Sequence, residues 1–334
     1  MSRARLQELG VDVPVLPATA VGSLPKPPEL VEARAQARRG AITAAQLDEK
    51  AREATAAWIA KQEELGLDIL VDGQQYRGEP VTWFAGRLKG FREGGLVRVW
   101  GNRYYRKPVI SGEVRWPGAF TVEWWRFAQG LTKKPVKGIL TGPYTLMDWS
   151  FNERYPSRRA ACLAIARELR READALVAAG CRVLQIDEPA FGARPDELGF
   201  AADAIRVMTK DLGAYTIAHV CYAPFESLVP SLVELAVDNL DLECANSDFA
   251  ALRPMGKSQF PRDLSLGVID VVSPRSDTPE GVLRRVRKAL TVLKPERIWV
   301  DPDCGLGGRT TEEAVAGLAA IAAAVQEARK ARGG

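Results

Sequence analysis

Short apolar runs alternate with longer amphipathic stretches along most of the chain, and each apolar run ends in polar residues or in a turn. Apolar runs of this kind indicate buried strands, whereas apolar residues at a spacing of three and four indicate helices. We expect strands whose carboxyl ends lie at Ser23, Gln74, Pro143, Asp187, Cys221, Glu243, Asp270 and Cys304. Eight strands separated mostly by single helices predict an α/β fold, a closed parallel (βα)8 TIM barrel.

Two of the expected helices have clear starts. Thr43 is followed by Gln46 three residues later, and Thr310 is followed by Glu313 at the same spacing. Each pair is a capping box, in which two side chains satisfy backbone N–H groups of the first turn. The first of these helices should end at Gly66, since glycine readily ends a helix.

The barrel pattern does not cover the whole chain evenly. Residues 1–17 form an N-terminal extension, because Pro14 and Pro17 interrupt any regular pattern before the barrel domain, which we expect over residues 18–334. From about residue 90 to 117, β-branched and aromatic residues replace the helical pattern. This change predicts an inserted antiparallel β-hairpin within the domain.

Composition limits the function classes. The hydrophobic fraction of 46% and the charged fraction of 26% are ordinary for a globular enzyme, so the chain can bury a large core. The net charge is only +4, and the basic clusters interleave with acidic residues and alanines on helical patterns. Such clusters are typical of solvated helix faces, and we expect no nucleic-acid partner.

Targeting signals and cysteine usage point to one compartment. The amino terminus is charged, and no run of about 18 apolar residues occurs, so we expect a cytoplasmic protein without a membrane partner. The five cysteines are an odd number scattered over a long chain. That pattern argues against a disulfide framework and for reduced thiols, some of them metal ligands.

The only histidine of the chain, His219, stands two residues before Cys221 on one expected strand. Residues i and i+2 project to the same side of a strand, so both can reach one ion, and imidazole with thiolate suits Zn²⁺. Glu243 and Cys304 end two further strands and could complete the set. Each residue also fits a structural interpretation, since a strand-end glutamate can be solvated and a cysteine before glycine can be a small buried hydrophobe.

Motifs along nearly the whole chain occur in the order found in one enzyme family. They are Val21–Pro25, Leu140–Pro143, Trp149–Phe151, Gln185–Ala190, His219–Tyr222, Glu243 and Asp301–Leu306. With these motifs the chain resembles the catalytic, C-terminal barrel of cobalamin-independent methionine synthase. The resemblance implies a zinc-activated thiol as nucleophile and the conversion of L-homocysteine to L-methionine.

The resemblance also implies roles for individual residues. His219, Cys221, Glu243 and Cys304 match the ligands of the catalytic zinc. Asp187 matches the acid that holds the amino group of homocysteine, and the turn at Gly22 and Ser23 matches the one that helps to hold its carboxylate. Gln74 stands where the family has a glutamate in a substrate-binding turn. Trp149 offers a flat surface to a planar donor, or it is a core aromatic.

Two departures from the family bear on the methyl donor. The resemblance covers only the second of the family's two barrels, and the segment Asp72–Gly78 looks more like short, archaeal-type enzymes that take the methyl group from a corrinoid. Val272 stands where the family has a histidine. Methyltetrahydrofolate must release an amine, which leaves poorly unless a general acid protonates it, whereas a cob(I)amide leaves without a proton. Asp270 or a water could still serve as that acid.

We therefore predict a zinc-dependent homocysteine methyltransferase whose preferred donor is methylcobalamin or another methylcorrinoid, with a corrinoid carrier protein as a possible partner. The first alternative donor is methyltetrahydrofolate or its polyglutamate. A second alternative changes the acceptor to another small thiol such as coenzyme M, although related barrels of that kind usually lack the glutamate ligand and the Asp187 contact. A structural zinc in a binding protein is a further alternative. The origin of the four expected ligands on three separate strands argues against it, because structural sites favour sulfur ligands on closely spaced loops.

Overall fold

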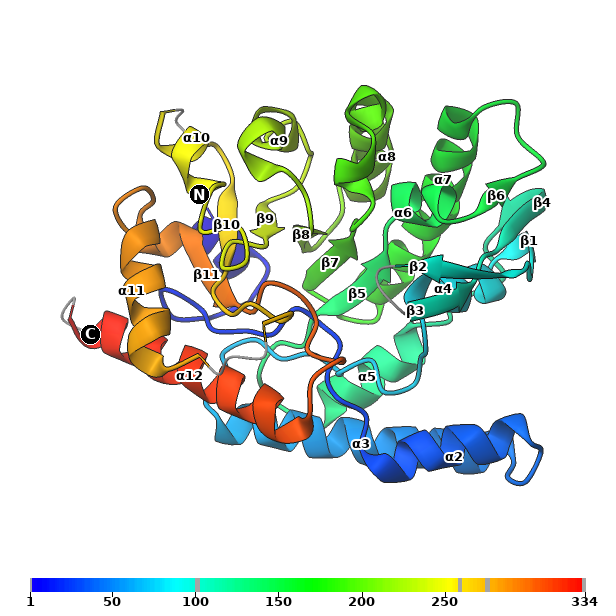
Figure 1. Ribbon diagram of the computed structural model, residues 1–334, viewed down its shortest axis with the longest axis horizontal. Coiled ribbons are helices and arrows are strands. Elements are labelled where there is room, and N and C mark those ends of the chain that lie inside the picture. The colour runs from blue at the N-terminus through cyan, green and yellow to red at the C-terminus, as the bar shows by residue number, and fades with distance from the viewer. Residues whose placement is uncertain (1, 100–102, 258–259, 274–276, 332–334) are drawn as a thin grey trace. The chain divides into compact units, whose positions relative to one another are not determined.

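Six buried strands are linked in one sheet (Figure 1). The computed structural model describes residues 2–99, 103–257, 260–273 and 277–331. The six strands of the sheet, in their order across it, are β11 (Ile298–Asp301), β10 (Asp263–Gly267), β9 (Asn239–Leu242), β8 (Tyr215–Val220), β7 (Val183–Asp187) and β5 (Gly138–Thr141). The pairs β5–β7, β7–β8 and β10–β11 are parallel. Nearly every residue of these strands is buried, as expected for a parallel sheet that is covered on both faces.

Two of the eight expected strands are not strands. The segments 18–23 and 67–72 make single parallel bridges, from Ala18 to Val300 and from Leu70 to Val136. The backbone N–H of Ala18 donates to the carboxylate of Asp68 (2.8 Å), so a side chain takes the place of a ladder partner. The α/β fold with a parallel sheet is confirmed, and closure into an eight-stranded barrel is not shown.

The chain divides into two compact units. Unit 1 contains Met1–Tyr76, Trp124–Lys137 and Asp241–Gly334, and unit 2 contains Arg77–Glu123 and Gly138–Leu240. Helix α5 (Val122–Gly130) begins in unit 2 and continues in unit 1. The predicted extension at residues 1–17 contains the short helix α1 (Ser2–Glu8).

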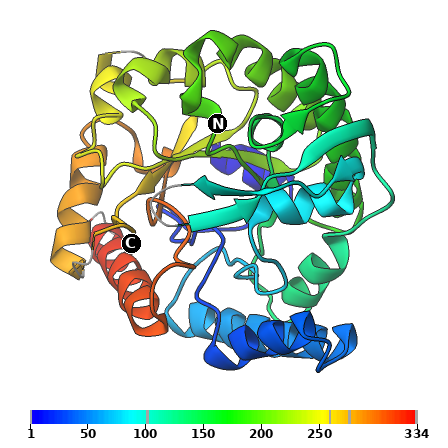
Figure 2. The same ribbon diagram turned by 45° about the vertical axis from the view of Figure 1, so that its right-hand side comes forward.

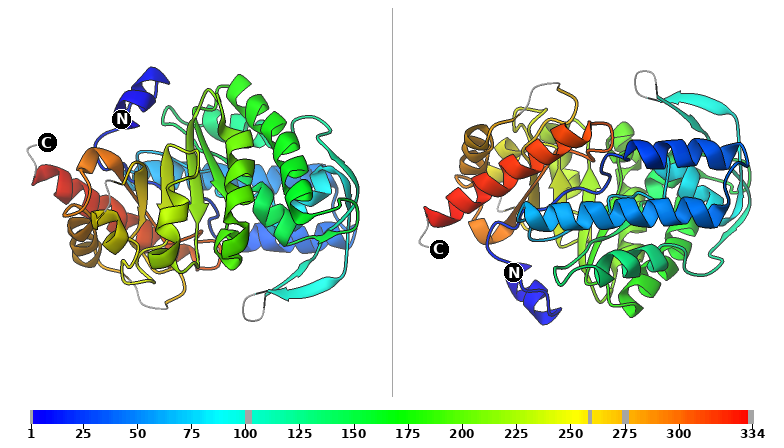
Figure 3. Two further views of the ribbon diagram at one scale, coloured as in Figure 1. Left: turned by 90° about the horizontal axis from the view of Figure 1, so that it is seen from above. Right: turned by 90° about the horizontal axis from the view of Figure 1, so that it is seen from below.

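Among the described residues, six helices lie wholly within unit 1. They are α1, α2 (Pro28–Arg38), α3 (Ala44–Glu64), α10 (Leu252–Lys257), α11 (Pro279–Ala289) and α12 (Thr311–Lys330), with a 3₁₀ turn at Pro295–Arg297. Both predicted capping boxes are present, at the starts of α3 and α12. Helices α2 and α3 lie side by side, as the blue helices of Figure 3 show. The alanine-rich face of α12 is buried, and α12 packs along α11.

Among the described residues, five helices lie wholly within unit 2. They are α4 (Pro80–Arg87), α6 (Pro143–Asp148), α7 (Arg158–Ala178), α8 (Leu198–Thr209) and α9 (Phe225–Leu232), with 3₁₀ turns at Phe191–Ala193 and Pro195–Glu197. Helices α7 and α8 pack against each other and are the green helices of Figure 2. Among the described residues of either unit, no helix has the length and apolar character needed to cross a bilayer.

The segment expected to hold one hairpin holds two antiparallel pairs. Its strands are β1 (Lys89–Arg92), β2 (Leu96–Val99), β3 (Arg103–Arg106) and β4 (Val109–Arg115), and β2 pairs with β3 inside the pair of β1 with β4. Residues 100–102 lie outside the described residues. The short strand β6 (Phe151–Asn152) adds to β4 in parallel, which gives the outer pair a third strand. Figure 3 shows the β2–β3 pair in cyan.

One buried carboxylate on α7 anchors the chain that leaves β4. Glu172 accepts hydrogen bonds from the indole N–H of Trp116 (2.6 Å) and the backbone N–H groups of Phe120 (3.0 Å) and Thr121 (2.7 Å). The hydroxyl of Thr121 donates to it as well (2.6 Å). Because a buried charge is costly unless it is hydrogen-bonded, these donors explain how Glu172 can be completely buried.

Candidate metal centre and substrate site

Three predicted ligands form a group that could hold a metal ion. The ligand atoms of His219, Cys221 and Cys304 all lie within 4.8 Å of one another. A zinc ion lies about 2.3 Å from a cysteine sulfur and about 2.0 Å from a histidine nitrogen, so small side-chain adjustments would bring all three onto one ion. Two thiolates and an imidazole are a donor set that suits zinc. The residues present therefore fit the metal.

Strand β8 supplies two of these residues. All of β8 is buried, His219 lies near its carboxyl end, and Cys221 follows the last strand residue. The two-residue spacing turns both side chains to the same side of the sheet, as the sequence predicted. Tyr222 then has a positive φ of 54°, which ends the extended conformation directly after the second ligand.

In unit 1 the loop after β11 brings Cys304 beside the predicted Gly-Ser turn. The backbone N–H of Leu306 donates to the carbonyl oxygen of Ser23 (2.8 Å). A Cβ on Gly305 would lie 2.1 Å from the Ser23 hydroxyl oxygen, so a larger residue at 305 would force the Ser23 side chain to move. Gly22 and Ser23, expected to bind substrate, thus lie directly beside the loop that carries one expected metal ligand.

Gln74 lies in a tight turn next to the same Gly-Ser segment. It is buried, has a positive φ of 55°, and its backbone N–H donates to Asp72 (2.8 Å). The backbone N–H of Leu24 donates to the carbonyl of Gly73 (3.1 Å), which joins the two turns. The structure therefore brings both predicted substrate-binding turns of unit 1 together.

Glu243, the fourth predicted ligand, is not part of the three-residue group. It is buried just after β9, and its Oε1 accepts a hydrogen bond from the side-chain amide of Asn246 (2.7 Å). The carboxylate of Asp303 accepts the backbone N–H groups of Cys244, Ala245 and Asn246 at 3.0, 2.9 and 2.7 Å. Burial raises the pKa of Asp303 to about 7, against these three donors, which lower it.

In unit 2, Asp187 lies at the same level as His219. Strand β7 pairs Asp187 with Thr141 of β5 on one side and with His219 of β8 on the other. Residues in register on neighbouring parallel strands project to the same face, and such strands are about 4.8 Å apart. A row of three side chains therefore runs across the carboxyl ends of β5, β7 and β8.

Two side chains support Asp187 from within its own unit. The amide of Gln185 donates to Asp187 Oδ1 (2.8 Å), and a guanidinium nitrogen of Arg77 lies 4.0 Å from Asp187 Oδ2. Arg77 is only 1% exposed and lies over the ring of Phe84. It lies in the segment Asp72–Gly78, and its burial beside Asp187 is not readable from the sequence.

Behind this row, Glu188 caps the start of α6. It accepts the backbone N–H groups of Tyr144 (3.0 Å) and Thr145 (2.7 Å) and the hydroxyl of Thr145 (2.7 Å). Burial raises the pKa of Glu188 to about 7, although the three hydrogen bonds lower it. A Cβ on Gly142 would lie 2.2 Å from the Glu188 carboxyl carbon, so glycine at the helix start makes room for the cap.

Trp149 and Asp270 occupy loops of different units. Trp149 in unit 2 ends α6, is half-buried, and accepts the hydroxyl of Tyr105 at its carbonyl oxygen (2.9 Å). The two rings lie 6.1 Å apart. Asp270 in unit 1 accepts the backbone N–H groups of Val272 (2.8 Å) and Ser273 (3.1 Å), while the Val272 side chain is 63% exposed. The catalytic role of Asp270 stays a prediction.

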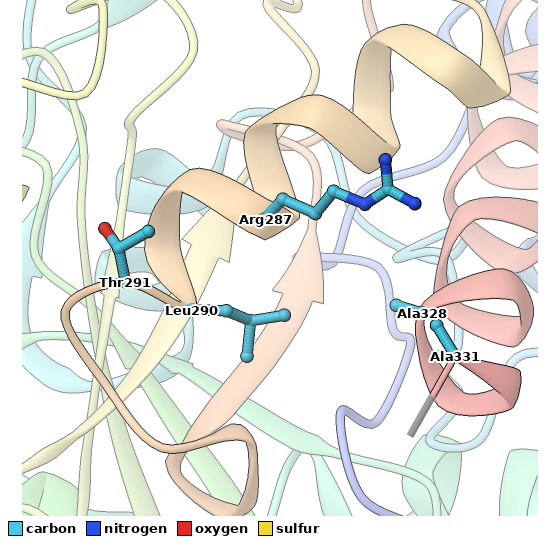
Figure 4. Close-up of a pocket in the computed structure, with 5 residues that line it drawn as sticks. All are labelled: Arg287, Leu290, Thr291, Ala328 and Ala331. Carbon is cyan, nitrogen blue, oxygen red and sulfur yellow. The ribbon is translucent and has the colours of Figure 1, made fainter. Parts of the chain in front are cut away.

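A cavity of about 390 Å³ lies elsewhere in unit 1, between α11 and α12 (Figure 4). Its lining consists of Arg287, Leu290, Thr291, Ala328 and Ala331. Only one of these side chains is charged, and none of the predicted site residues is among them. We do not assign it to the candidate site.

The fold and the site together define a class: an α/β protein whose parallel strands carry a candidate zinc site and, in register with its histidine, the carboxylate of Asp187 at their carboxyl ends. The chain matches the family described as "Cobalamin-independent synthase, Catalytic domain" over residues 16–329. It belongs to this family, and the predicted resemblance is confirmed.

Two relatives that carry an enzyme name are similar to this chain over most of its length. The chain is 37% identical over 343 residues to the 5-methyltetrahydropteroyltriglutamate–homocysteine methyltransferase of Corynebacterium glutamicum (strain R). The aligned region covers 98% of this chain and 46% of that protein. The chain is 38% identical over 339 residues to the enzyme of the same name from Streptomyces avermitilis, covering 98% of this chain and 44% of that protein. The chain thus spans less than half the length of these relatives.

A solved structure matches over nearly its full length. It is a B12-independent methionine synthase from Shewanella sp. W3-18-1 in complex with selenomethionine, with a TM-score of 0.84 and 26% identity, covering 96% of this chain and 99% of that one. A putative vitamin-B12-independent methionine synthase from Listeria monocytogenes has the same fold, with a TM-score of 0.74 and 20% identity.

Proposed function

We propose that this protein is a zinc-dependent methyltransferase that methylates the thiol of L-homocysteine to give L-methionine. The observation that carries the proposal is the register of Asp187 with His219 on β7 and β8. An acid for an ammonium group thus lies one strand away from a ligand of a thiol-binding metal. Homocysteine carries an ammonium group and a thiol on one short chain, which matches this pair.

The chain's own residues would perform distinct tasks. His219, Cys221, Cys304 and Glu243 would hold zinc, which favours deprotonation of a bound thiol and so makes it a nucleophile at neutral pH. Asp187, supported by Gln185 and Arg77, would bind the ammonium group. Ser23 and the adjoining Gly22 and Gln74 turns would hold the substrate carboxylate, since they border the Cys304 loop.

The names of relatives support the same acceptor. The Corynebacterium and Streptomyces proteins are homocysteine methyltransferases by name, and the Shewanella protein was solved with selenomethionine, an analogue of the proposed product. Coenzyme M is a weaker candidate, because its anionic sulfonate would meet the Asp187 carboxylate instead of an ammonium group.

For the methyl donor we propose a methylated corrinoid, such as methylcobalamin or a corrinoid carrier protein. The support is local: Val272, exposed in a loop capped by Asp270, stands where the family has a histidine that could protonate a leaving amine. Trp149, half-buried beside Tyr105, would offer the donor a flat surface.

A folate donor is the second candidate, and the relatives favour it. Both named relatives use a 5-methyltetrahydropteroyltriglutamate donor by name, and the family description says cobalamin-independent. In this case Asp270 or a water would have to supply the proton.

We also propose that residues 18–334 form one (βα)8 barrel domain after an N-terminal extension at residues 1–17. The support is that residues 16–329 match a single family domain. The bridges at Ala18 and Leu70 are parallel, as those of the first two barrel strands would be.

The purified protein tests the proposed reaction. We expect about one zinc per chain and methionine formation from homocysteine with at least one of the two donors. Cys304→Ser should lose most of the metal and the activity, whereas Cys162→Ser, which changes a buried thiol on α7, should retain both. A protein that holds zinc but methylates no homocysteine with either donor would refute the proposed function.

A further inference from the structure

The loop after β9 is tied to the loop after β11 by one side chain. Asp303, the residue before Cys304, accepts the backbone N–H groups of three consecutive residues that follow Glu243, at 2.7 to 3.0 Å. Three donors on one buried carboxylate fix the path of the 244–246 loop more tightly than loop packing alone would.

The strand between these loops is shaped to let this contact form. β10 lies between β9 and β11 in the sheet. A Cβ on Gly267, its last residue, would lie 2.4 Å from Asp303 Oδ1 and 2.9 Å from the carbonyl oxygen of Leu242. The Asp303 side chain therefore passes close over the end of β10, and glycine at 267 is what leaves it room.

The fixed loop in turn holds Glu243. Asn246, whose backbone N–H is one of the three bound by Asp303, donates from its side-chain amide to Glu243 Oε1 at 2.7 Å. A hydrogen bond to one carboxylate oxygen sets the rotation of the whole carboxylate group, and with it the direction of both oxygens. Metal-binding carboxylates are commonly oriented by outer hydrogen bonds of this kind.

We propose that Asp303 and Asn246 are positioning residues of the metal centre. Asp303 locks the Glu243 loop to the loop that carries Cys304, and Asn246 sets the orientation of the Glu243 carboxylate. The inference rests on the zinc site of the proposed function. It assigns the two residues no contact with the substrate or the metal.

The test measures metal binding without homocysteine or a methyl donor. Zinc affinity is obtained by competition with a chromophoric chelator, and the ligand field by the absorption spectrum of the cobalt(II)-substituted protein. We expect Asn246→Ala to weaken zinc binding about tenfold to a hundredfold. Its cobalt spectrum should shift in the same way as that of Glu243→Gln. Asp303→Asn, which turns one acceptor oxygen into a donor facing backbone N–H groups, should weaken zinc binding by a similar factor.

Asn152→Ala is the matched control. Asn152 also donates its side-chain amide to a neighbour three residues away, the carbonyl of Tyr155 (2.9 Å), but it lies in unit 2 on β6. This variant should keep the zinc affinity and the cobalt spectrum of the unmodified protein. The double variant Asn246→Ala/Glu243→Gln should lose no more zinc affinity than Glu243→Gln alone, because Asn246 acts through Glu243.

Two results would overturn the inference. One is an Asn246→Ala protein with unchanged zinc affinity and cobalt spectrum, and the other is a Glu243→Gln protein with unchanged zinc affinity, which would leave nothing to position. If Asn246→Ala does not fold, Asn246→Ser answers the same question. Because no substrate is present, a protein that behaves as expected here but does not methylate homocysteine would refute the proposed function and uphold this inference.

Discussion

In the proposed function, Asp187 is the residue at which binding of the homocysteine amino group can be separated from metal binding. Its carboxylate lies beside His219 in register, yet it is held by Gln185 and Arg77. Asp187→Asn should weaken homocysteine binding roughly tenfold to a hundredfold, because a charged hydrogen bond contributes about 1.5–3 kcal/mol. Zinc content should not change.

Calorimetric titration of the zinc-loaded protein with homocysteine measures this effect, and 4-mercaptobutanoate, which lacks the amino group, is the matched ligand. The variant should bind 4-mercaptobutanoate as the unmodified protein does. Equal losses of zinc and homocysteine would instead make Asp187 part of the metal site.

At this scale the sequence predicts the strand-end residues well but not the residues that hold them. The sequence predicts His219, Cys221 and Cys304 because ligand-type residues end the expected strands, and the structure brings the three together. Asp303, Asn246 and Arg77 were not found, since their contacts join segments far apart in the chain or depend on loop conformation. No local pattern encodes such a contact.

At the scale of the elements, the hydrogen bonds of Glu188 join the end of β7 to the start of α6. We expect the free energy of unfolding to depend on pH through this residue. Burial raises its pKa from 4.5 to about 7 in the folded protein. The folded state therefore binds more protons than the unfolded state, and this contribution to stability, complete below pH 4.5, is lost as the pH rises through about 7. Glu188→Gln cannot titrate.

Urea unfolding of both proteins at pH 4.5 and pH 8 checks this expectation. Relative to Glu188→Gln, the unmodified protein should lose a few kcal/mol of stability between the two pH values. Glu153 is an exposed glutamate paired with Arg92 and serves as the control. The stability of Glu153→Gln should change between the two pH values as that of the unmodified protein does. If the unmodified protein and Glu188→Gln instead had parallel profiles, the pKa of Glu188 would not be raised in the folded protein.

The accuracy of the predicted elements follows from how each is stabilised. Long amphipathic helices and fully apolar strands follow from periodicity alone, and both capping boxes were found from two residues each. The segments 18–23 and 67–72 are apolar too, but a side-chain carboxylate bonds the backbone of Ala18, and each segment keeps a single bridge. The β-branched and aromatic residues of the inserted region predict strands there. They do not predict the two nested antiparallel pairs, because these depend on the register between strands.

For the molecule as a whole, the two candidate methyl donors are a methylcorrinoid, whose leaving group needs no proton, and methyltetrahydrofolate, whose leaving amine needs one. With Val272 in place of a histidine, a donor that needs protonation should react slowly, since a general acid contributes about 10²–10⁴-fold. We expect methylcobalamin to support methionine formation at least about tenfold faster than methyltetrahydrofolate with either a short or a long glutamate tail.

Steady-state rates with each donor decide the question, and Val272→His is the informative variant. It should raise the folate rate without raising the corrinoid rate. Val31→His, at another exposed valine of unit 1, controls for the added imidazole. Turnover with methyltetrahydrofolate and none with any methylcorrinoid would establish the folate reaction in place of the corrinoid one.

The Glu172 anchor has a practical consequence for engineering this chain. Because one buried carboxylate on α7 accepts the hydrogen bonds of residues 116–121, the inserted strands are anchored where the chain leaves β4. Surface tips tolerate insertions far better than hydrogen-bonded bases. A fluorescent reporter or an affinity tag spliced next to Phe120 would therefore strip α7 of these hydrogen-bond donors and leave the Glu172 carboxylate buried without them.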